Sequence, residues 1–247
     1  GAKTANTSPA TTVYPGPASA YRLTAATSTP SPGVADALSI RLVDAYQNVV
    51  TNFSGDKDLS FSGLSAAGDG TLPTVTDKTG AARDLGQVTT ISFVQGQSTA
   101  GGNLVAYKAE GPVTLAASDG TLSTSAAGGA GVSLTIPNEV PEVGSVGLER
   151  PRNVAMRISI ASLLAGVSDA NRDVVSFGGV TGSSTNGASL WTNATHVLYL
   201  VPPGGNVADQ FRYTVSDGTG NGEGVVDVVI GEDPTGDRKS TRLNSSH

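Results

Sequence analysis

The chain has 247 residues and a formal net charge of −6, with 15 Lys and Arg against 21 Asp and Glu. Nucleic acids and anionic membrane surfaces select clustered Lys and Arg, so this charge argues against both as partners. The chain has no cysteine, which excludes disulfides and thiolate metal ligands. No apolar run approaches the roughly 20 residues of a membrane helix, so we expect no membrane insertion in this segment.

The first half of the chain predicts a series of short strands. Residues 1–19 are rich in Thr, Ser, Pro and Ala and predict an extended linker. Apolar residues then alternate with polar ones, which places them on one face of a strand. The expected strands lie at residues 21–25, 38–42, 59–61, 88–93, 104–107, 113–117 and 132–136.

A domain boundary is expected near residue 137, because Pro137 and Pro141 interrupt strand pairing there. The alternation then restarts, with one helical turn expected at residues 160–165. We therefore predict domains at residues 20–137 and 138–231. The strands expected in the second domain lie at residues 154–158, 174–177, 188–191, 197–201, 211–215 and 225–230.

Residues 232–247 predict a disordered tail. From Asp237 onward they read DRKSTRLNSSH, which resembles the translation of a common sequencing adapter, so we expect this end to be foreign to the natural protein. The first residues lack both an initiator Met and the apolar core of a signal peptide. We therefore expect the chain to be a window of a longer protein.

The two halves repeat a motif. Ser-Asp-Gly-Thr occurs at residues 118–121 and again at 216–219, about one immunoglobulin-like domain apart. Asp-Gly favours tight turns, so each copy is expected to join the last two strands of its domain. The pattern predicts an all-β fold of two tandem immunoglobulin-like antiparallel β-sandwiches.

The second half resembles the bacterial cadherin-like tandem repeat of surface and adhesin proteins. The matching pieces are Asn138 to Pro141, residues 158–173, the LYLVPP strand at 198–203 and, above all, DQFRYTVSDG at 209–218. Asn171-Arg172 stands where that family usually has Asp-Gly.

The first half is similar to bacterial immunoglobulin-like repeats of the invasin and filamin-like kind. The similarity lies at residues 42–51, 106–110 and 113–120, with Gln47 where such repeats often have Gly.

These resemblances imply a non-catalytic structural or adhesive repeat of a large secreted or cell-surface bacterial protein. Its implied partners are neighbouring immunoglobulin-like repeats and a host protein, matrix protein or glycan. Two alternatives stay open. One is an accessory carbohydrate-binding or spacer region of a secreted polysaccharide-active enzyme, and the other is a calcium-rigidified adhesin repeat.

Calcium is the cofactor considered, because Asp169, Asn171 and Asp173 place oxygen ligands at alternate positions. An EF-hand is excluded, since Val stands where that loop needs its Gly and its Glu. The same residue types are also ordinary turn formers, and the two interpretations stay open. The candidate ligands are Asp169, Asp173, Asp209, Asp217, Asn138 and Glu139.

Catalytic chemistry has little support in the sequence. Outside the adapter-like tail the only histidine is His196, for which we expect an exposed or hairpin-end position. The GTGNGEG segment at residues 218–224 has Glu where a dinucleotide fingerprint needs its third Gly, so it predicts a hairpin. Trp191, the only tryptophan, is assigned to the sandwich core, although such a residue could also stack on a sugar. We predict no enzyme activity.

Overall fold

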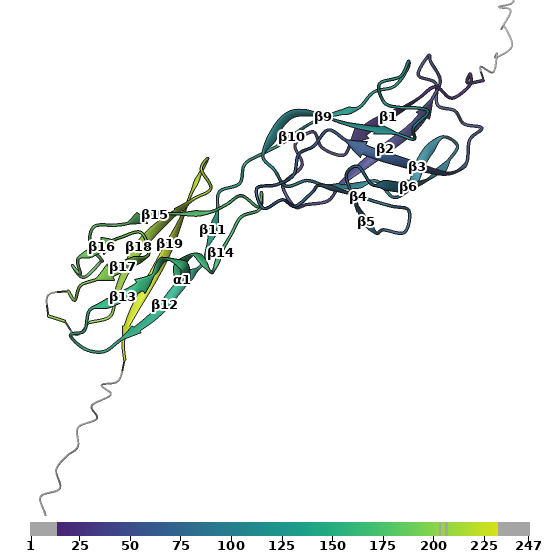
Figure 1. Cartoon of the computed structure of the whole chain (residues 1–247). Coiled ribbons are helices and arrows are strands. Elements are labelled where there is room, and N and C mark those ends of the chain that lie inside the picture. The colour runs from purple at the N-terminus through teal and green to yellow at the C-terminus, as the bar shows by residue number, and fades with distance from the viewer. Residues whose placement is uncertain (1–13, 203, 206, 232–247) are drawn as a thin grey trace, which may run out of the picture. The chain divides into compact units, whose positions relative to one another are not determined.

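The computed structural model describes residues 14–202, 204–205 and 207–231 (Figure 1). The predicted tail at 232–247, including the adapter-like residues, and residues 1–13 of the predicted linker lie outside the described part. The chain divides between Pro137 and Asn138 into two compact units, here called unit 1 and unit 2.

Unit 1 is a β-sandwich whose described strands follow one hydrogen-bonded order, β10-β9-β3-β6-β7-β2-β8-β4-β5, with β1 paired to β2. Its pairings between named strands are antiparallel. The strands are β1 (Ala20–Ala25), β2 (Asp36–Val43), β3 (Gly55–Ser62), β4 (Thr74–Thr76), β5 (Ala82–Asp84), β6 (Val88–Val94), β7 (Gln97–Ala100), β8 (Asn103–Val105), β9 (Glu110–Ser118) and β10 (Val132–Ile136).

Period-two burial builds the core of unit 1, as the sequence predicts. Leu38, Ile40 and Leu42 on β2 point inward, while the residues between them are more exposed. They pack against inward side chains from β1, β3, β6 and β9. Besides Ile40 and Leu42, the largest fully buried apolar members of this core are Tyr21, Phe61, Phe93, Leu59, Ile91 and Leu104.

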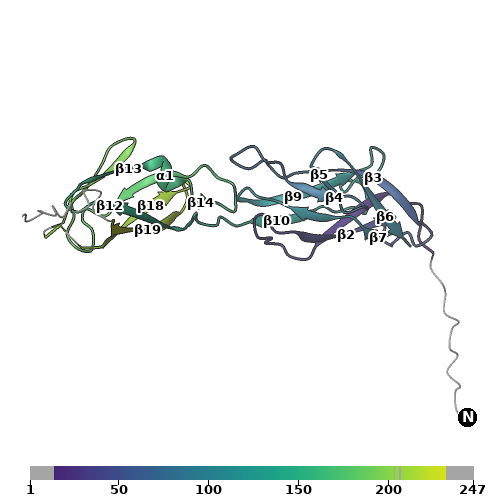
Figure 2. The ribbon, with the colours of Figure 1, turned by 90° about the horizontal axis from the view of Figure 1, so that it is seen from below.

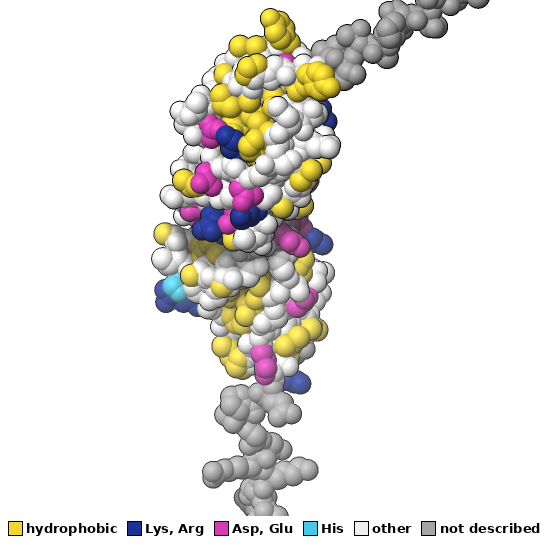
Figure 3. All heavy atoms as spheres, turned by 90° about the vertical axis from the view of Figure 1, so that its right-hand side faces the viewer, with side chains coloured by type: hydrophobic (Ala, Val, Ile, Leu, Met, Phe, Trp, Pro, Cys, Tyr) yellow, Lys and Arg dark blue, Asp and Glu magenta, His cyan; other side chains and the backbone are white. Residues whose placement is uncertain are grey.

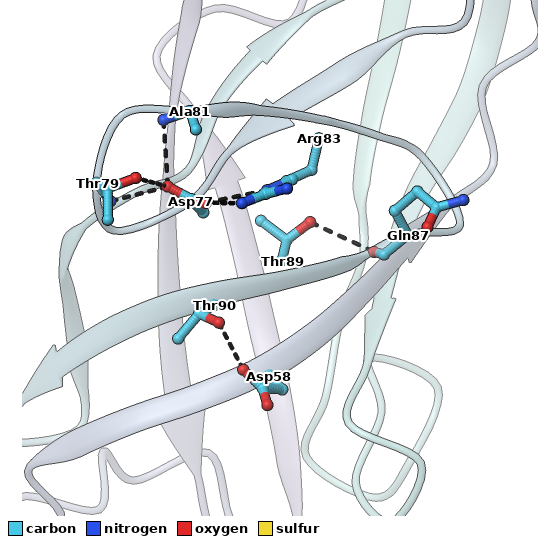
Figure 4. A network of polar contacts seen from close by, with 8 residues as sticks. All are labelled: Asp58, Asp77, Thr79, Ala81, Arg83, Gln87, Thr89 and Thr90. Carbon is cyan, nitrogen blue, oxygen red and sulfur yellow. Dashed lines mark hydrogen bonds and ion pairs between the residues drawn. The ribbon is translucent and has the colours of Figure 1, made fainter.

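Polar side chains hold the turns of unit 1. Figure 4 shows Asp77, in the turn between β4 and β5, surrounded by donors. Its Oδ1 accepts from the backbone N–H of Thr79 and Ala81, at 2.8 and 3.1 Å, and from the Thr79 hydroxyl. Its Oδ2 accepts from Arg83 Nε and Nη2 at 3.0 and 2.9 Å. The Thr79 hydroxyl and the Arg83 guanidinium, with the backbone donors, hold the pKa of Asp77 well below its usual range.

Unit 2 is also a β-sandwich. A four-stranded sheet has the order β12-β19-β18-β15, a three-stranded sheet has the order β13-β17-β16, and β11 pairs with β14. The elements are β11 (Glu142–Val143), β12 (Ser145–Arg150), β13 (Met156–Ser159), α1 (Ile160–Leu164), β14 (Val167–Ser168), β15 (Ser176–Val180), β16 (Leu190–Thr192), β17 (His196–Tyr199), β18 (Asp209–Ser216) and β19 (Asn221–Ile230).

One ladder between named strands departs from the predicted antiparallel pairing. β12, the strand that opens the four-stranded sheet, runs parallel to the final strand β19, with Ser145 opposite Val225 and Arg150 opposite Ile230. Figures 1 and 2 show the two strands side by side. On its other edge β19 forms the antiparallel hairpin with β18 that the Asp-Gly turn predicts.

The core of unit 2 is made by its own residues. Phe211, Tyr213 and Val215 of β18 face inward, and Tyr199 of β17 packs near Phe211 with ring centroids 6.2 Å apart. The short helix α1 contributes the buried Leu163. No helix in the described part of the chain is long and apolar enough to cross a membrane. Both units are therefore immunoglobulin-like β-sandwiches, and the predicted all-β fold is confirmed.

Candidate functional site

The predicted calcium ligands gather mainly where unit 2 begins. Glu142 of β11 pairs with Ser168 of β14, so the residues before β11 run beside those after β14. The backbone N–H of Glu139 donates to Oδ1 of Asn171, at 2.7 Å, and Asn171 is fully buried. The segment that opens the unit is thus fixed to the Asp169–Asp173 loop.

Asn138 joins this region to the β18–β19 turn. Its Nδ2 donates to Oδ2 of Asp217 at 3.0 Å. Oδ1 of Asp217 accepts from the backbone N–H groups of Thr219 and Gly220, at 2.6 and 2.5 Å. Burial opposes ionisation of Asp217, but these three residues outweigh it and lower the pKa of the carboxyl. The carboxylate is therefore held in its charged form.

Two buried oxygen atoms of this region have no hydrogen-bond partner among the described residues. They are Oδ1 of Asn138 and Oδ2 of Asp169. The other oxygen of Asp169 accepts from the backbone N–H of Asp173 at 3.0 Å. Buried acceptors normally have a partner, because an unpaired one loses its hydration without compensation. Oxygen atoms of this kind are the ligands that Ca²⁺ prefers, so the residues present fit a hard cation.

Asp209 lies away from that region, so the structure does not bring all six predicted residues together. Asp209 begins β18 and Asp217 follows its end, and eight residues of strand separate them by about 26 Å. Within the described residues, no three His, Cys, Asp or Glu side chains form a metal-binding group. A cation at the start of unit 2 would therefore depend on Asn and backbone oxygens as well as carboxylates.

Asp209 is instead the centre of a buried hydrogen-bond cluster. It accepts from the hydroxyls of Ser184 and Tyr199, the latter at 2.6 Å, and from the backbone N–H groups of Asn186 and Gln210, at 2.9 and 2.8 Å. Burial opposes ionisation, but these donors outweigh it and hold the pKa of Asp209 below its usual value. Burial and the same carboxylate raise the pKa of Tyr199 to about 12.

His196 lies at the start of β17, the hairpin-end position that the sequence predicts. Its Nδ1 is 2.8 Å from the Thr195 hydroxyl and 3.4 Å from Nη2 of Arg157. Its ring nitrogen thus contacts a hydroxyl and a guanidinium, whereas a Ser-His-Asp arrangement needs a carboxylate to orient the ring.

The prediction that Trp191 fills the core is wrong, because its side chain is 66% exposed. Ala188 and Leu190 take the inward positions of this segment, so the alternation of the strand turns Trp191 outward. The same alternation is visible in the sequence and could have located the exposed tryptophan. The sequence analysis missed Arg157 and Leu198, which lie beside it.

Comparison with known proteins finds a family model that matches unit 2. Residues 137–230 match the family model described as a cadherin-like domain. Unit 2 is thus a cadherin-like, immunoglobulin-like sandwich, while the resemblance of unit 1 to invasin and filamin-like repeats stays a prediction. No curated protein matches the chain.

Solved structures similar to the chain include an adhesin, an enzyme and a surface-layer protein. The Escherichia coli adhesin FdeC is 19% identical, over 89% of this chain and 67% of its own, with a TM-score of 0.35. An endo-fucoidan hydrolase of glycoside hydrolase family 107 is 15% identical over 71% of this chain, with a TM-score of 0.28, and the chain spans 24% of its length. Domains 4 and 5 of the S-layer protein SbsC are 12% identical over 71% of this chain and 99% of their own, with a TM-score of 0.27.

Proposed function

We propose that the chain is a non-catalytic, load-bearing or adhesive segment of a large secreted or cell-surface bacterial protein. Its nearest partners are neighbouring immunoglobulin-like repeats of the same protein. The cadherin-like match of unit 2 supports this role. The observation that carries the proposal is the parallel pairing of β12 with β19.

Parallel end strands suit a module that is pulled from both ends. β12 lies near the N-terminal end of unit 2, and β19 forms its C-terminal end. Tension at the two ends pulls parallel strands along their axes in opposite directions. The ladder from Ser145–Val225 to Arg150–Ile230 is then loaded in shear, so its hydrogen bonds share the force. Antiparallel end strands would open one bond at a time.

Polar side chains support the same role. The carboxylates of Asp77 and Asp209 accept backbone N–H groups and hydroxyls that shape the turns. In unit 1, Asp44 likewise accepts from the backbone of Gly16, Tyr46 and Asn48 at 2.9 Å. A carboxylate committed to such bonds stabilises the fold and is poorly placed to move protons.

Single-molecule stretching tests the load-bearing role. The chain has no cysteine, so handles can be attached through new cysteines at chosen positions. Handles at Ser145 and Ile230 pull β12 against β19 in shear, whereas handles at Ser145 and Val225, which lie opposite each other at one end of the ladder, peel the two strands apart from that end. We expect a severalfold higher unfolding force for the first pair at the same loading rate. Equal forces in the two geometries would contradict the proposal.

We infer a second role, calcium binding where unit 2 begins, from the two unpartnered oxygens of Asn138 and Asp169. Asn138, Asp169 and Asp217 would hold the cation with backbone oxygens, and Asp173 and Glu139 lie within the same loops. Bound Ca²⁺ would supply positive charge that offsets the acidic excess of this unit.

Thermal melts with calcium and with chelator test this role. Calcium at about 100 times its Kd should raise the melting temperature of unit 2 by about 10 °C. Asn138→Ala and Asp169→Ala should abolish the rise, whereas Glu149→Gln, an exposed change at the far end of β12, should keep it. An unchanged midpoint in the unmodified chain would remove the calcium proposal and leave the mechanical one untouched.

A further inference from the structure

The outer face of the β13-β17-β16 sheet carries a row of exposed side chains. Trp191 on β16 lies opposite Leu198 on β17, and Leu198 lies opposite Arg157 on β13. Trp191 is 66% exposed and Leu198 is 40% exposed. An indole left this open keeps a large apolar area in water, which favours binding of a ligand over it.

The row forms one side of a shallow depression of about 310 Å³, lined by Arg157, Trp191, Thr192, Asn193, His196 and Leu198. Besides the indole N–H of Trp191, four of these six residues carry polar side chains that donate or accept hydrogen bonds. The turn between β16 and β17 holds two of them in place, because Oδ1 of Asn193 accepts from the backbone N–H of His196 at 2.8 Å. An apolar platform is thus bordered by fixed polar groups.

This arrangement matches the chemistry of a pyranose ring. One face of such a ring presents C–H groups with partial positive charge, which the negative face of an indole attracts. The rim of the ring presents hydroxyls, for which Asn193, Thr192 and His196 offer partners. A protein partner fits less well, because a stable protein interface buries about 800 Å² on each side, whereas the exposed apolar part of this row is one tryptophan and one leucine.

The charge of the residues that line the depression favours a sugar that carries a negative charge. The depression is lined by Arg157 and His196 and by no carboxylate, although residues 138–236 contain eleven Asp and Glu against five Arg. The guanidinium of Arg157 is exposed, and no salt bridge of this side chain is found in the described residues. Figure 3 shows histidine atoms next to Lys or Arg atoms on the surface. A guanidinium binds carboxylate or sulfate through two parallel hydrogen bonds.

We propose that this face binds an anionic pyranose unit of a polysaccharide. The sugar ring stacks on Trp191, and Arg157 takes its carboxylate or sulfate group. The proposal is independent of the mechanical and calcium roles, because it uses neither β12–β19 pairing nor the start of unit 2.

Fluorescence of the full chain tests the proposal directly, because Trp191 is its only tryptophan. Polygalacturonate supplies carboxylates, dextran sulfate supplies sulfates, and dextran is the neutral form of the latter. We expect at least one anionic polymer to protect Trp191 from acrylamide quenching, and dextran to give no protection. All titrations contain chelator, so that calcium bound elsewhere plays no part.

Retardation in gels that contain the same polymers measures affinity for the variants. Trp191→Ala and Arg157→Gln should each weaken binding about tenfold. Tyr46→Ala is the matched control, since it removes an 86% exposed aromatic from unit 1 and should leave binding unchanged. Circular dichroism verifies that each variant is folded.

Three outcomes would overturn the proposal. The first is that neither anionic polymer protects Trp191 from quenching. The second is that Trp191→Ala and the unmodified chain are retarded equally, and the third is that dextran and dextran sulfate bind equally. If carboxylate and sulfate polymers differ, the stronger one identifies the anionic group that Arg157 takes.

Discussion

Four non-glycine residues in the described part of the chain adopt a left-handed backbone that favours glycine, namely Gln47, Gln95, Asn153 and Arg172. Gln47 has φ of 72° and Arg172 has φ of 59°. Both stand at positions where the repeats named in the sequence analysis are expected to have Gly more often than not, so the departures visible in the sequence coincide with strained backbone in the structure. Side chains at these positions cost conformational energy that Gly would not.

Gln47→Gly should stabilise unit 1 by about 1 kcal/mol, because a side chain in left-handed backbone costs about that amount or slightly more. The side chain of Gln47 is exposed, and its contact with Arg22 lies on the surface, so little is lost. Urea unfolding of unit 1 measures the change. Gln97→Gly on β7, where φ is not positive, is the control and should destabilise. A loss of stability in Gln47→Gly would show that the turn is not strained.

Burial of single residues was predicted well where alternation is regular and poorly elsewhere. Leu38, Ile40 and Leu42 follow the pattern and are buried. Arg150 and Trp191 invert the usual preferences, because the arginine is fully buried and the tryptophan is exposed. Pairing of their strands decides which way each side chain points, and that pairing depends on residues far apart in the sequence.

At the scale of elements, a buried polar cluster fixes the region around the start of β18. Arg150 ends β12, and its Nη2 donates to the carbonyl oxygens of Gly205 and Val207 at 3.0 and 3.4 Å. Its guanidinium also lies 5.7 Å from the centre of the Tyr199 ring, whose hydroxyl donates to Asp209. Strands β12, β17 and β18 are thus joined by polar contacts as well as apolar ones.

Asp209→Ala should destabilise unit 2 by about 3 kcal/mol, because it leaves the hydroxyls of Ser184 and Tyr199 and two backbone N–H groups without their acceptor. Tyr199→Phe removes one donor from the same cluster and should cost about 1 kcal/mol. Urea unfolding followed by Trp191 fluorescence measures both variants. Equal losses in the two variants would mean that Asp209 contributes nothing beyond its bond to Tyr199.

Elements with clear period-two patterns were predicted, and the short helix α1 lies where one helical turn was expected. β12 was missed, because only Val146 and Leu148 alternate in it and both are merely half-buried. The parallel pairing of β12 with β19 could not be read from local sequence, since it joins residues at opposite ends of the unit. The contacts among the candidate calcium ligands could not be read from local sequence either, because Asn138 and Asp217 meet only after folding.

At the scale of the whole molecule, the two cores draw on different stretches of sequence. The core of unit 1 uses residues between Tyr21 and Ile136, and that of unit 2 uses residues between Ile158 and Val228. Substitutions at sites that share no contacts usually have additive effects. We therefore expect the changes caused by Gln47→Gly and Asp209→Ala to be independent of one another when the two are combined.

The position of β19 between β12 and β18 also governs the order of events during synthesis. Ribosomes release a chain from its N-terminus, so the last strand made must enter the middle of an unfinished sheet. Until β19 emerges, β12 has no neighbouring strand in this sheet. We expect the incomplete unit 2 to be more sensitive to proteases and to incorrect strand pairing during this time. Unit 1 has all its strands once Ile136 is released. The nascent chain therefore carries a complete unit 1 while unit 2 still lacks β19.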